Sequence, residues 1–484
     1  MTRSILLLST AILAACASNP ASLPGIDGDR EEIFAVAPNA PAEWAASGVS
    51  GMAPTGNWLD QFNDPVMVSL VQEALANSPT LESRAALVRA SEAFARSARS
   101  QRLPSVDGSV SAGVTSNAFD TPAGLDRSTD GTYGLGVDAS WEADLWGRIG
   151  RNIDAADADL AGSKADLAAA ELSIAAQTAI AWINLNAALA QENVALQTYE
   201  ARDRVRILTE RRFQRGLAQA LDVRTARSAL AGAEAAISQR RQLSGEAARR
   251  LEILLGRYPA AEIEATADLP VLNELAPEGN PMLLLSRRPD IAGAEASVVA
   301  AGLRAEQARL AMLPALRLSG SVSNNETEFA DVIDPERIAA RLVASLIQPL
   351  FTGGRLDAQR DAAVAQAEAA IANYANSALT AWREVEDALA ADMYLAEQED
   401  AQLRALEEAR LAEELAERQY TSGTITIFNL IDAQTRRLNS ESLVVSARSS
   451  RAVNRISYHL ALGGGLPVQA VAGITEAQPE DAAG

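Results

Sequence analysis

The sequence predicts a mostly helical α+β protein that is built from two copies of one unit. Three observations support this fold class: long runs without proline, short stretches of period-two alternation, and an internal repeat with an offset of 207 residues between matching glycines. Glycine and proline break helices, so a run that lacks them can continue as one helix. The two longest runs extend from Arg148 to Tyr258 and from Arg355 to Leu462.

The chain begins with a segment typical of export. Arg3 precedes the apolar run from Ile5 to Leu13, and small residues lead to Cys16. A basic start, a short apolar core and small residues before the cleavage point indicate a secretory signal peptide rather than a membrane span. Leu13-Ala14-Ala15-Cys16 resembles the bacterial lipobox, and Cys16 is the only cysteine. We therefore expect acylation of Cys16, and Ala17 in place of aspartate favours the outer membrane.

The next segment carries no periodicity. Residues Gly25 to Trp58 are rich in Pro, Gly, Ala and Asn, which predicts an extended linker on the surface. Asp64-Pro65 is a helix start, with an N-cap residue followed by proline at the first helical position. Helical patterning then continues to Leu103-Pro104.

Strands follow the first helices. Apolar and small residues alternate with polar ones from Val106 to Thr115, and again from Tyr133 to Trp141. Such alternation predicts a hairpin with one apolar and one polar face. We expect the residues between, Asn117 to Asp130, to form a polar loop. Trp141 and Trp146, where strand meets helix, either mark a membrane interface or pack the joint, and packing is favoured for Trp146.

The long runs predict helical hairpins that turn at single glycines. Between Ser163 and Ala231 the only glycine is Gly216, and between Arg355 and Leu462 the only one is Gly423. A helix from Arg148 to Gln214 would be about 100 Å long at 1.5 Å per residue. Apolar residues and alanines recur every seven residues, which is typical of helices packed as coiled coils. A coiled-coil spacer has the same pattern, so the heptads alone do not decide the function.

The second half of the chain repeats the first. Pro79 matches Pro289, Pro104 matches Pro314, and a second strand pair follows around Leu316 to Ser323 and Ile338 to Ile347. One supersecondary unit is therefore present twice. Each chain offers four strands, whereas a membrane barrel needs about eight to close without an edge. Three chains would supply twelve strands.

Composition excludes several functions. The formal net charge of −21 leaves no basic surface for nucleic acid. No run of 18 apolar residues follows the signal, so we expect no transmembrane helix. His459 is the only histidine, no metal cluster or nucleophile–base pair is recognisable, and Gly463-Gly464-Gly465 is a helix stop. We expect neither an enzyme nor a cofactor besides the lipid on Cys16.

The repeat and four motifs resemble the TolC/OprM-type outer-membrane factors, in their NodT-like lipoprotein branch. The motifs are WEADLWGRI, SRRPDIAGAE, QPLFTGGR and the two glycine tips, and the resemblance covers nearly all of the mature chain. It implies a homotrimer with a 12-stranded outer-membrane β-barrel that continues into a periplasmic α-helical barrel. It also implies an exit duct that docks to a periplasmic adaptor and an inner-membrane pump, most often of the RND type.

The resemblance also places a gate at the hairpin tips, near Gly216 and Gly423. Matching positions hold Asp222 at the first tip and Tyr420, Asn429 and Asp432 at the second. This chain departs from the family pattern, which has an acidic residue at the position of Asn429 and in some relatives an arginine at that of Ile425. Arg224 or Arg436 could replace that arginine as the partner of Asp222. Three copies of Asp432 would form a negative ring, as in cation-preferring pores.

Each gate residue also has a simpler structural interpretation. Asp222 follows a glycine turn and could cap the second helix of its hairpin. Asp432 could be an ordinary solvated carboxylate, and Tyr420 could serve packing. Gly216 and Gly423 are expected to take positive φ in either case.

The resulting division of the chain has six parts. They are a signal peptide (1–15), an acylated N-terminus with an extended linker (16–63), a first repeat (64–258) with a strand pair at 105–142 and a hairpin at 148–256, an equatorial connection (259–280), a second repeat (281–466) with a strand pair at 316–349 and a hairpin at 355–462, and a C-terminal tail (467–484). The predicted function is a passive efflux duct, with drugs or other small toxic compounds as the expected cargo. The alternatives are metal efflux, type I protein secretion, or a periplasmic scaffold lipoprotein.

Overall fold

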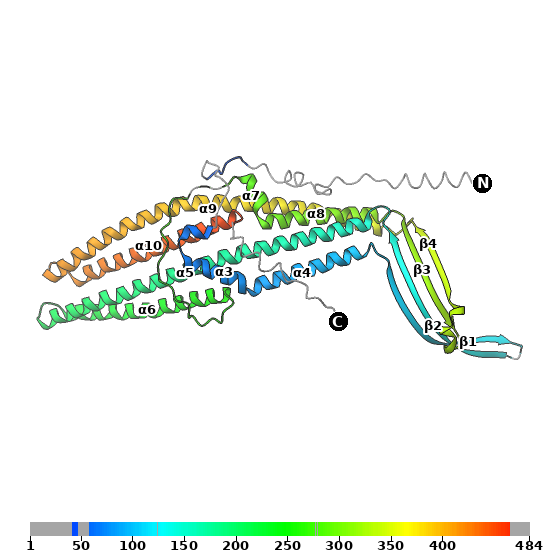
Figure 1. Ribbon diagram of the computed structural model, residues 1–484. Coiled ribbons are helices and arrows are strands. Elements are labelled where there is room, and N and C mark those ends of the chain that lie inside the picture. Colours follow the sequence, from blue (N-terminus) through cyan, green and yellow to red (C-terminus); the bar gives the residue numbers. More distant parts are fainter. Residues whose placement is uncertain (1–40, 47–57, 123, 276, 278, 465–484) are drawn as a thin grey trace. The chain divides into compact units, whose positions relative to one another are not determined.

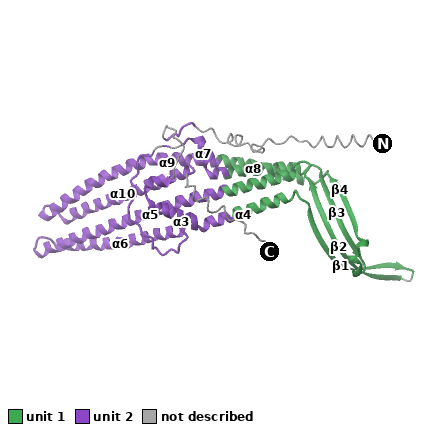
Figure 2. Ribbon diagram, in the orientation of Figure 1, with its two compact units in different colours: residues 1–37, 87–164, 293–375 green, residues 38–86, 165–292, 376–484 purple. Residues whose placement is uncertain are grey.

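The computed structural model describes residues 41–46, 58–122, 124–275, 277 and 279–464. Cys16, the signal peptide and the tail after residue 464 lie outside the described residues. The described chain forms two compact units (Figure 2). Unit 1 comprises residues 87–164 and 293–375 of the described chain, and unit 2 comprises the described residues of 38–86, 165–292 and 376–484.

Unit 1 contains one antiparallel sheet in the order β1-β2-β3-β4 (Figure 1). The strands are β1 (Ser105–Thr121), β2 (Gly124–Ala143), β3 (Ala315–Glu326) and β4 (Ala339–Ile347). The strand pairs of the two repeats therefore join through β2 and β3, with Val137 opposite Val322. The outer edges of β1 and β4 have no strand beside them within the described chain.

One face of this sheet is apolar and exposed. Directly opposite residues share a face in an antiparallel sheet, and Val110 pairs with Leu135 while Gly320 pairs with Leu342. Val110 is 82% exposed and Leu342 is 83% exposed. The other face carries Ser109, Ser111 and Asp138 among its polar residues. The sheet thus has the two faces that the alternation predicts.

The expected polar loop from Asn117 to Asp130 is wrong. Strand pairing continues from Asn117 opposite Ser128 to Thr121 opposite Gly124, where the chain reverses. Backbone hydrogen bonds form a β-ladder whatever the side chains are, so polar residues on both faces do not end a strand. The reversal uses Gly124 at φ 117°, in a region open to glycine.

The helices of unit 1 are segments of α4, α5, α8 and α9, each of which also has residues in unit 2. α4 (Pro79–Ser100) and α8 (Pro289–Leu310) are both 22 residues long and both begin at a proline. Arg99 pairs with Asp157 at 2.8 Å, and Arg304 pairs with Asp159. Ala98, Ile149 and Ile153 form a small apolar cluster. These contacts hold α4 and α8 against the start of α5 (Arg148–Gln214).

Unit 2 contains the long hairpins. α5 turns into α6 (Ala220–Leu254), and α9 (Arg355–Ser422) turns into α10 (Ile427–Ala461). One described helix, α5, includes an 18-residue window with a mean hydropathy of 1.3, long and apolar enough to cross a membrane by length and composition alone. Within that window 56% is buried inside the protein, as in the core helix of a helical bundle.

The main core of unit 2 lies where both hairpins meet the short helices. These are the 3₁₀ turn η1 (Trp58–Phe62) and α3 (Pro65–Asn77), and a further short helix, α7 (Pro281–Arg287), begins the second repeat. Asp64 caps α3 by accepting from the amides of Val66 and Met67, and Trp182 of α5 donates to the same carboxylate at 2.6 Å. The core residues include Met67, Ile183, Leu251 and Ile456.

The linker prediction needs a correction at both of its described parts. Trp44 is 1% exposed and Trp58 is 3% exposed, so neither lies on the surface. The amides of Ala45 and Ala46 donate to the carboxylate of Glu386 in α9, at 2.8 and 2.7 Å. Composition gave no sign of this attachment because its acceptor lies about 340 residues away.

The connection between the repeats is fixed by buried charges. Glu252 accepts from the amides of Ala261 and Glu262 at 2.7 Å each. Arg455, buried beside Asp392, donates to the carbonyl of Asn273 at 2.9 Å. Charged groups hold the segment through directional bonds because it lacks regular backbone pairing.

His459 is buried at the end of α10. Its Nε2 lies 3.1 Å from Oε1 of Gln61, and its ring stacks on Trp58. Burial, together with the nearby Arg455, lowers the pKa of His459 to about 4. The native state therefore holds the neutral imidazole, whereas the unfolded chain would take up a proton below about pH 6.5.

This shift predicts a pH-dependent stability. The contribution of His459 is complete above about pH 6.5 and is lost as the pH falls toward 4, because the unfolded state then binds the extra proton. The free energy of unfolding should fall by at most about 3 kcal/mol over this range, which follows from the size of the pKa shift. We expect the melting temperature, followed by far-UV circular dichroism, to fall more steeply between pH 7 and 4.5 in the wild type than in His459→Gln. Parallel curves would contradict the assignment.

Candidate functional site

The two hairpin tips lie side by side within unit 2. Gly216 at φ 75° and Gly423 at φ 85° occupy the left-handed region, which favours glycine. In each tip the amide of the residue after the glycine bonds back into the last turn of the helix, from Leu217 to the carbonyl of Arg212 and from Thr424 to that of Gln419. Both turns thus have the backbone geometry that the single glycines predict.

Tyr420 links the two tips. Its hydroxyl lies 2.9 Å from the Oγ1 of Thr209 in α5, and both side chains are buried. Around it Val205, Ala226, Ile427 and Leu430 bring together residues of α5, α6 and α10. Tyr420 therefore packs the tip and also makes a polar link between the two hairpins of one chain, while its role in a gate stays a prediction.

Arg212 is a tip residue that the sequence analysis missed. It donates to the carbonyl of Tyr420 at 2.8 Å and to that of Thr421 at 3.2 Å, and it lies over the Tyr420 ring. One guanidinium thereby bonds two carbonyls in the last turn of α9. Arg211 precedes it in the sequence, and nothing in the local pattern distinguishes the two arginines.

Arg202 makes a second cross-link between the hairpins, further from the tips. It donates to the side chains of Gln434 at 2.9 Å and Thr435 at 2.7 Å in α10. Burial lowers the pKa of this guanidinium, and the nearby Glu413 partly offsets the effect. A buried charge needs such partners because desolvation is costly.

The remaining predicted gate residues make local contacts within one chain. Asp222 accepts from the amide of Gln219 at 2.9 Å in a capping box, so it caps α6. The Oγ1 of Thr426 donates to Asn429 at 2.6 Å, and Asp432 pairs with Arg436 at 2.7 Å. Arg436 thus pairs with Asp432 rather than with Asp222. Asn429 and Asp432 are exposed, so both are accessible to a neighbouring chain.

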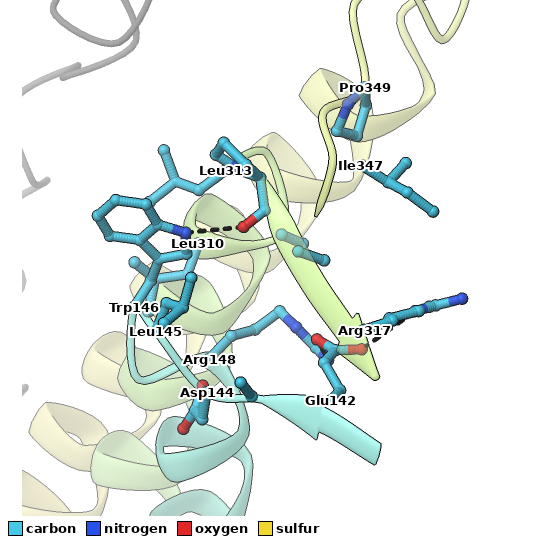
Figure 3. A pocket seen from close by; sticks show the side chains of 14 residues that line it. Glu142, Asp144, Leu145, Trp146, Arg148, Leu310, Leu313, Arg317, Ile347 and Pro349 are labelled. Carbon is cyan, nitrogen blue, oxygen red and sulfur yellow. Dashed lines mark hydrogen bonds and ion pairs between the residues drawn. The ribbon is translucent and has the colours of Figure 1, made fainter. Parts of the chain in front are cut away.

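A second site lies in unit 1, where the strands meet the helices. A cavity of about 320 Å³ is lined by Glu142, Trp146, Arg148 and Arg317 among others (Figure 3). Glu142 accepts from Arg148 at 2.7 Å and lies 3.5 Å from Arg317, and the indole of Trp146 donates to the carbonyl of Pro314. Trp146 therefore bonds to the joint although it is 44% exposed, and Trp141 likewise donates to the carbonyl of Arg102.

No group of three or more His, Cys, Asp or Glu side chains suited to a metal ion occurs among the described residues. The polar side chains at the tips instead hold helices together.

The family follows from a match to its model. The model described as outer membrane efflux protein matches residues 70–257 and 280–464. The chain belongs to the outer membrane efflux protein family. The two matched segments correspond to the two repeats, so the duplication and the resemblance seen in the sequence are both confirmed.

Individual relatives agree with this assignment. The pyoverdine export outer membrane protein OpmQ of Pseudomonas aeruginosa is 31% identical over 94% of this chain and 95% of its own. The antibiotic efflux pump outer membrane protein ArpC of Pseudomonas putida is 28% identical over 96% of each chain. The solved outer-membrane channel OprN superposes with a TM-score of 0.80 at 29% identity, over 88% of this chain and 97% of that one.

The Tyr420–Thr209 bond predicts a local stability effect. Tyr420→Phe should make the tip easier to open by about 1–3 kcal/mol, because it leaves a buried hydroxyl without this partner. Hydrogen exchange of the tip amides measures the opening free energy. The double variant Tyr420→Phe/Thr209→Val should recover much of the loss. Tyr394→Phe, at an exposed tyrosine of the same helix, is the matched control. Equal exchange in Tyr420→Phe and the control would contradict the assigned link.

Proposed function

We propose that this protein is the outer-membrane exit duct of a tripartite efflux system. The observation that carries the proposal is the sheet of unit 1, which has an exposed apolar face, a polar face and two open edges. In lipid an open edge would leave backbone groups unpaired, so such a sheet must close with other strands. Three copies supply twelve strands, and a closed barrel would place the apolar face toward lipid and the polar face toward water.

The helical hairpins would continue this duct. At 1.5 Å per residue, the 67 residues of α5 span about 100 Å, far beyond a bilayer. In this proposal they cross the periplasm toward an adaptor and an inner-membrane pump, most often of the RND type. Acylation of Cys16 would anchor each chain to the outer membrane. The pump would supply the energy, and the duct would conduct passively.

The proposed cargo is drugs or other small toxic compounds. The names of two relatives support export of small molecules, since OpmQ exports pyoverdine and ArpC serves an antibiotic efflux pump. Metal efflux and protein secretion are alternative cargoes for the same duct. A periplasmic scaffold lipoprotein is the alternative without a duct, but it would have no use for an exposed apolar sheet.

The proposed gate is the ring of tips. Three copies of Asp432, with Asn429 beside it and Asp222 on the first tip, would surround the narrow end with negative charge. The links made by Tyr420 and Arg212 would hold each chain's two tips together. Opening would then require the tips to separate from those of the neighbouring copies.

Single-channel conductance in planar bilayers tests this function. The wild-type trimer should show a small, cation-preferring conductance. Asp222→Asn/Asp432→Asn, which removes charge but keeps hydrogen-bond acceptors, should lose the cation preference and conduct more. Asp387→Asn is the matched control, since Asp387 also pairs with an arginine four residues away and lies far from the tips. Absence of conductance from folded, inserted protein would overturn the duct. If the double variant had the conductance and cation preference of the wild type, the gate would have to lie elsewhere in the duct.

A further inference from the structure

The segment between β3 and β4, residues 327–338, folds back over one face of the sheet in unit 1. It contains two 3₁₀ turns, η2 (Phe329–Ile333) and η3 (Pro335–Arg337). Val332 of η2 is only 7% exposed, although it lies outside any strand. The β3–β4 segment is therefore packed on the protein rather than extended into the surroundings.

The strand residues that hold this segment lie on the apolar face of the sheet. Alternate residues of a strand share a face, and so do directly opposite residues of neighbouring antiparallel strands. Asn324 and Glu326 therefore lie on the face of Val322, the residue opposite Val137. Tyr133 is opposite Glu326 and lies on the same face. The β3–β4 segment thus covers the end of the apolar face where β3 stops.

Asn324 and Tyr133 attach η2 to this face. The side-chain amide of Asn324 donates to the carbonyls of Asp331 and Val332, at 2.9 Å each. Asn324 is 4% exposed, and a buried amide without such acceptors would be costly. The rings of Tyr133 and Phe329 meet edge to face, with 5.7 Å between their centroids. A hydrogen-bonded side chain and an aromatic pair therefore fix the same turn.

Arg337 holds the segment at its other end. Its guanidinium lies 3.0 Å from carboxylate oxygens of Glu326 and Asp331, and 3.4 Å from one of Asp334. Three carboxylates thus surround this arginine already, so it offers little charge to an anionic lipid headgroup.

The β3–β4 segment presents large apolar side chains outward. Phe329 is 72% exposed, Ile333 is 77% exposed and Ile338 is 51% exposed. They continue the exposed apolar surface of the sheet, to which Val322 belongs with 48% exposure. A continuous exposed apolar surface indicates contact with a membrane or with another protein.

The aromatic residues of β2 give the level of this segment in a membrane. α8 ends at Leu310 and β3 begins at Ala315, so β3 runs away from the helices. Trp141 and Tyr133 lie eight residues apart on the apolar face of β2, with Tyr133 further from the helices. At about 3.4 Å per residue and a tilt of about 40°, this spacing is roughly 20 Å across a bilayer. Barrels of this kind have aromatic residues at both borders of an apolar band about 25 Å tall.

We propose that the β3–β4 segment is a membrane contact that inserts Phe329 and Ile333 among the acyl chains of the outer leaflet. The inference rests on the outer-membrane barrel of the proposed function and adds a second attachment to the membrane. In that barrel the segment lies on the lipid side, because it covers the apolar face. The lipid on Cys16 would anchor the chain from the periplasmic side, whereas this segment would fix the depth of the strands at the opposite border.

Lipid quenching of a fluorescent probe tests this contact in the full, acylated protein. Ile333→Cys is labelled with the fluorophore NBD and reconstituted into phosphatidylcholine vesicles in which a fraction of the lipids carry a nitroxide on the acyl chain. We expect the probe at position 333 to be quenched about as strongly as one at Val110→Cys on the apolar face. Labelling of the unsubstituted chain measures any background from Cys16.

The matched control places the probe on the same face but beyond the apolar band. Ala118→Cys lies four residues after Val114, the last valine of β1, and Ala118 is also exposed. Its probe should be quenched several-fold less. Quenching at position 333 as weak as at 118, with strong quenching at Val110→Cys, would overturn the contact and leave the proposed duct intact. Absence of quenching at position 110 in inserted protein would overturn the lipid-facing sheet itself, and the contact with it.

A second variant tests the attachment of the segment. Asn324→Asp replaces the donor with a carboxylate that faces the carbonyls of Asp331 and Val332, so the segment should detach and quenching at Ile333→Cys should fall several-fold. Asn325→Asp makes the same change on the opposite face of β3 and should leave the quenching unchanged. Equal quenching in the two variants would contradict the attachment that places the segment on the apolar face.

Discussion

The organisation of this protein depends on one constraint, the need to satisfy the backbone at the two edges of a four-stranded sheet. β1 and β4 end the sheet of one chain, and its apolar face is open to the surroundings. Soluble proteins cover or blunt such edges because unpaired strands recruit other chains. Here the exposed valines and leucines continue across all four strands, which favours completion by further copies in lipid over burial within one chain.

The helices meet a related constraint in unit 2. A helix of 67 residues cannot be covered by one domain, so it needs partners along its whole length. Within the chain, buried arginines such as Arg202 and Arg455 fix the contacts between helices. Buried charges therefore set how the helices of one chain pack on each other.

Much of the fold could be predicted because its signals are local. A single glycine in a long proline-free run predicts both a helical hairpin and the place where it turns, and Gly216 and Gly423 have the required positive φ. Asp64 before Pro65 predicted the start of α3, because an N-cap residue followed by proline is also a local signal. Period-two alternation predicted the apolar face of the sheet, because every second side chain of a strand lies on the same face.

The rest could not be predicted because it depends on contacts between distant segments. Trp44 is buried where Glu386 holds the adjacent backbone, and no pattern near Trp44 indicates that acceptor. The strand residues from Asn117 to Asp130 have polar side chains on both faces, so hydropathy gave no sign of their pairing. At the tips, the role of Arg212 follows from the position of the other hairpin. The proposed gate would involve residues of other copies, so a single sequence says even less about it.

The most direct test of the central claim is the environment of neighbouring residues on β1 in membrane-reconstituted protein. Nitroxide labels at Val110→Cys and Ser109→Cys would lie on opposite faces of the sheet. The account predicts that the label at position 110 is relaxed by oxygen dissolved in lipid, whereas the label at position 109 is relaxed by a water-soluble nickel chelate. Equal access of the nickel chelate to both labels would contradict a sheet that separates lipid from water.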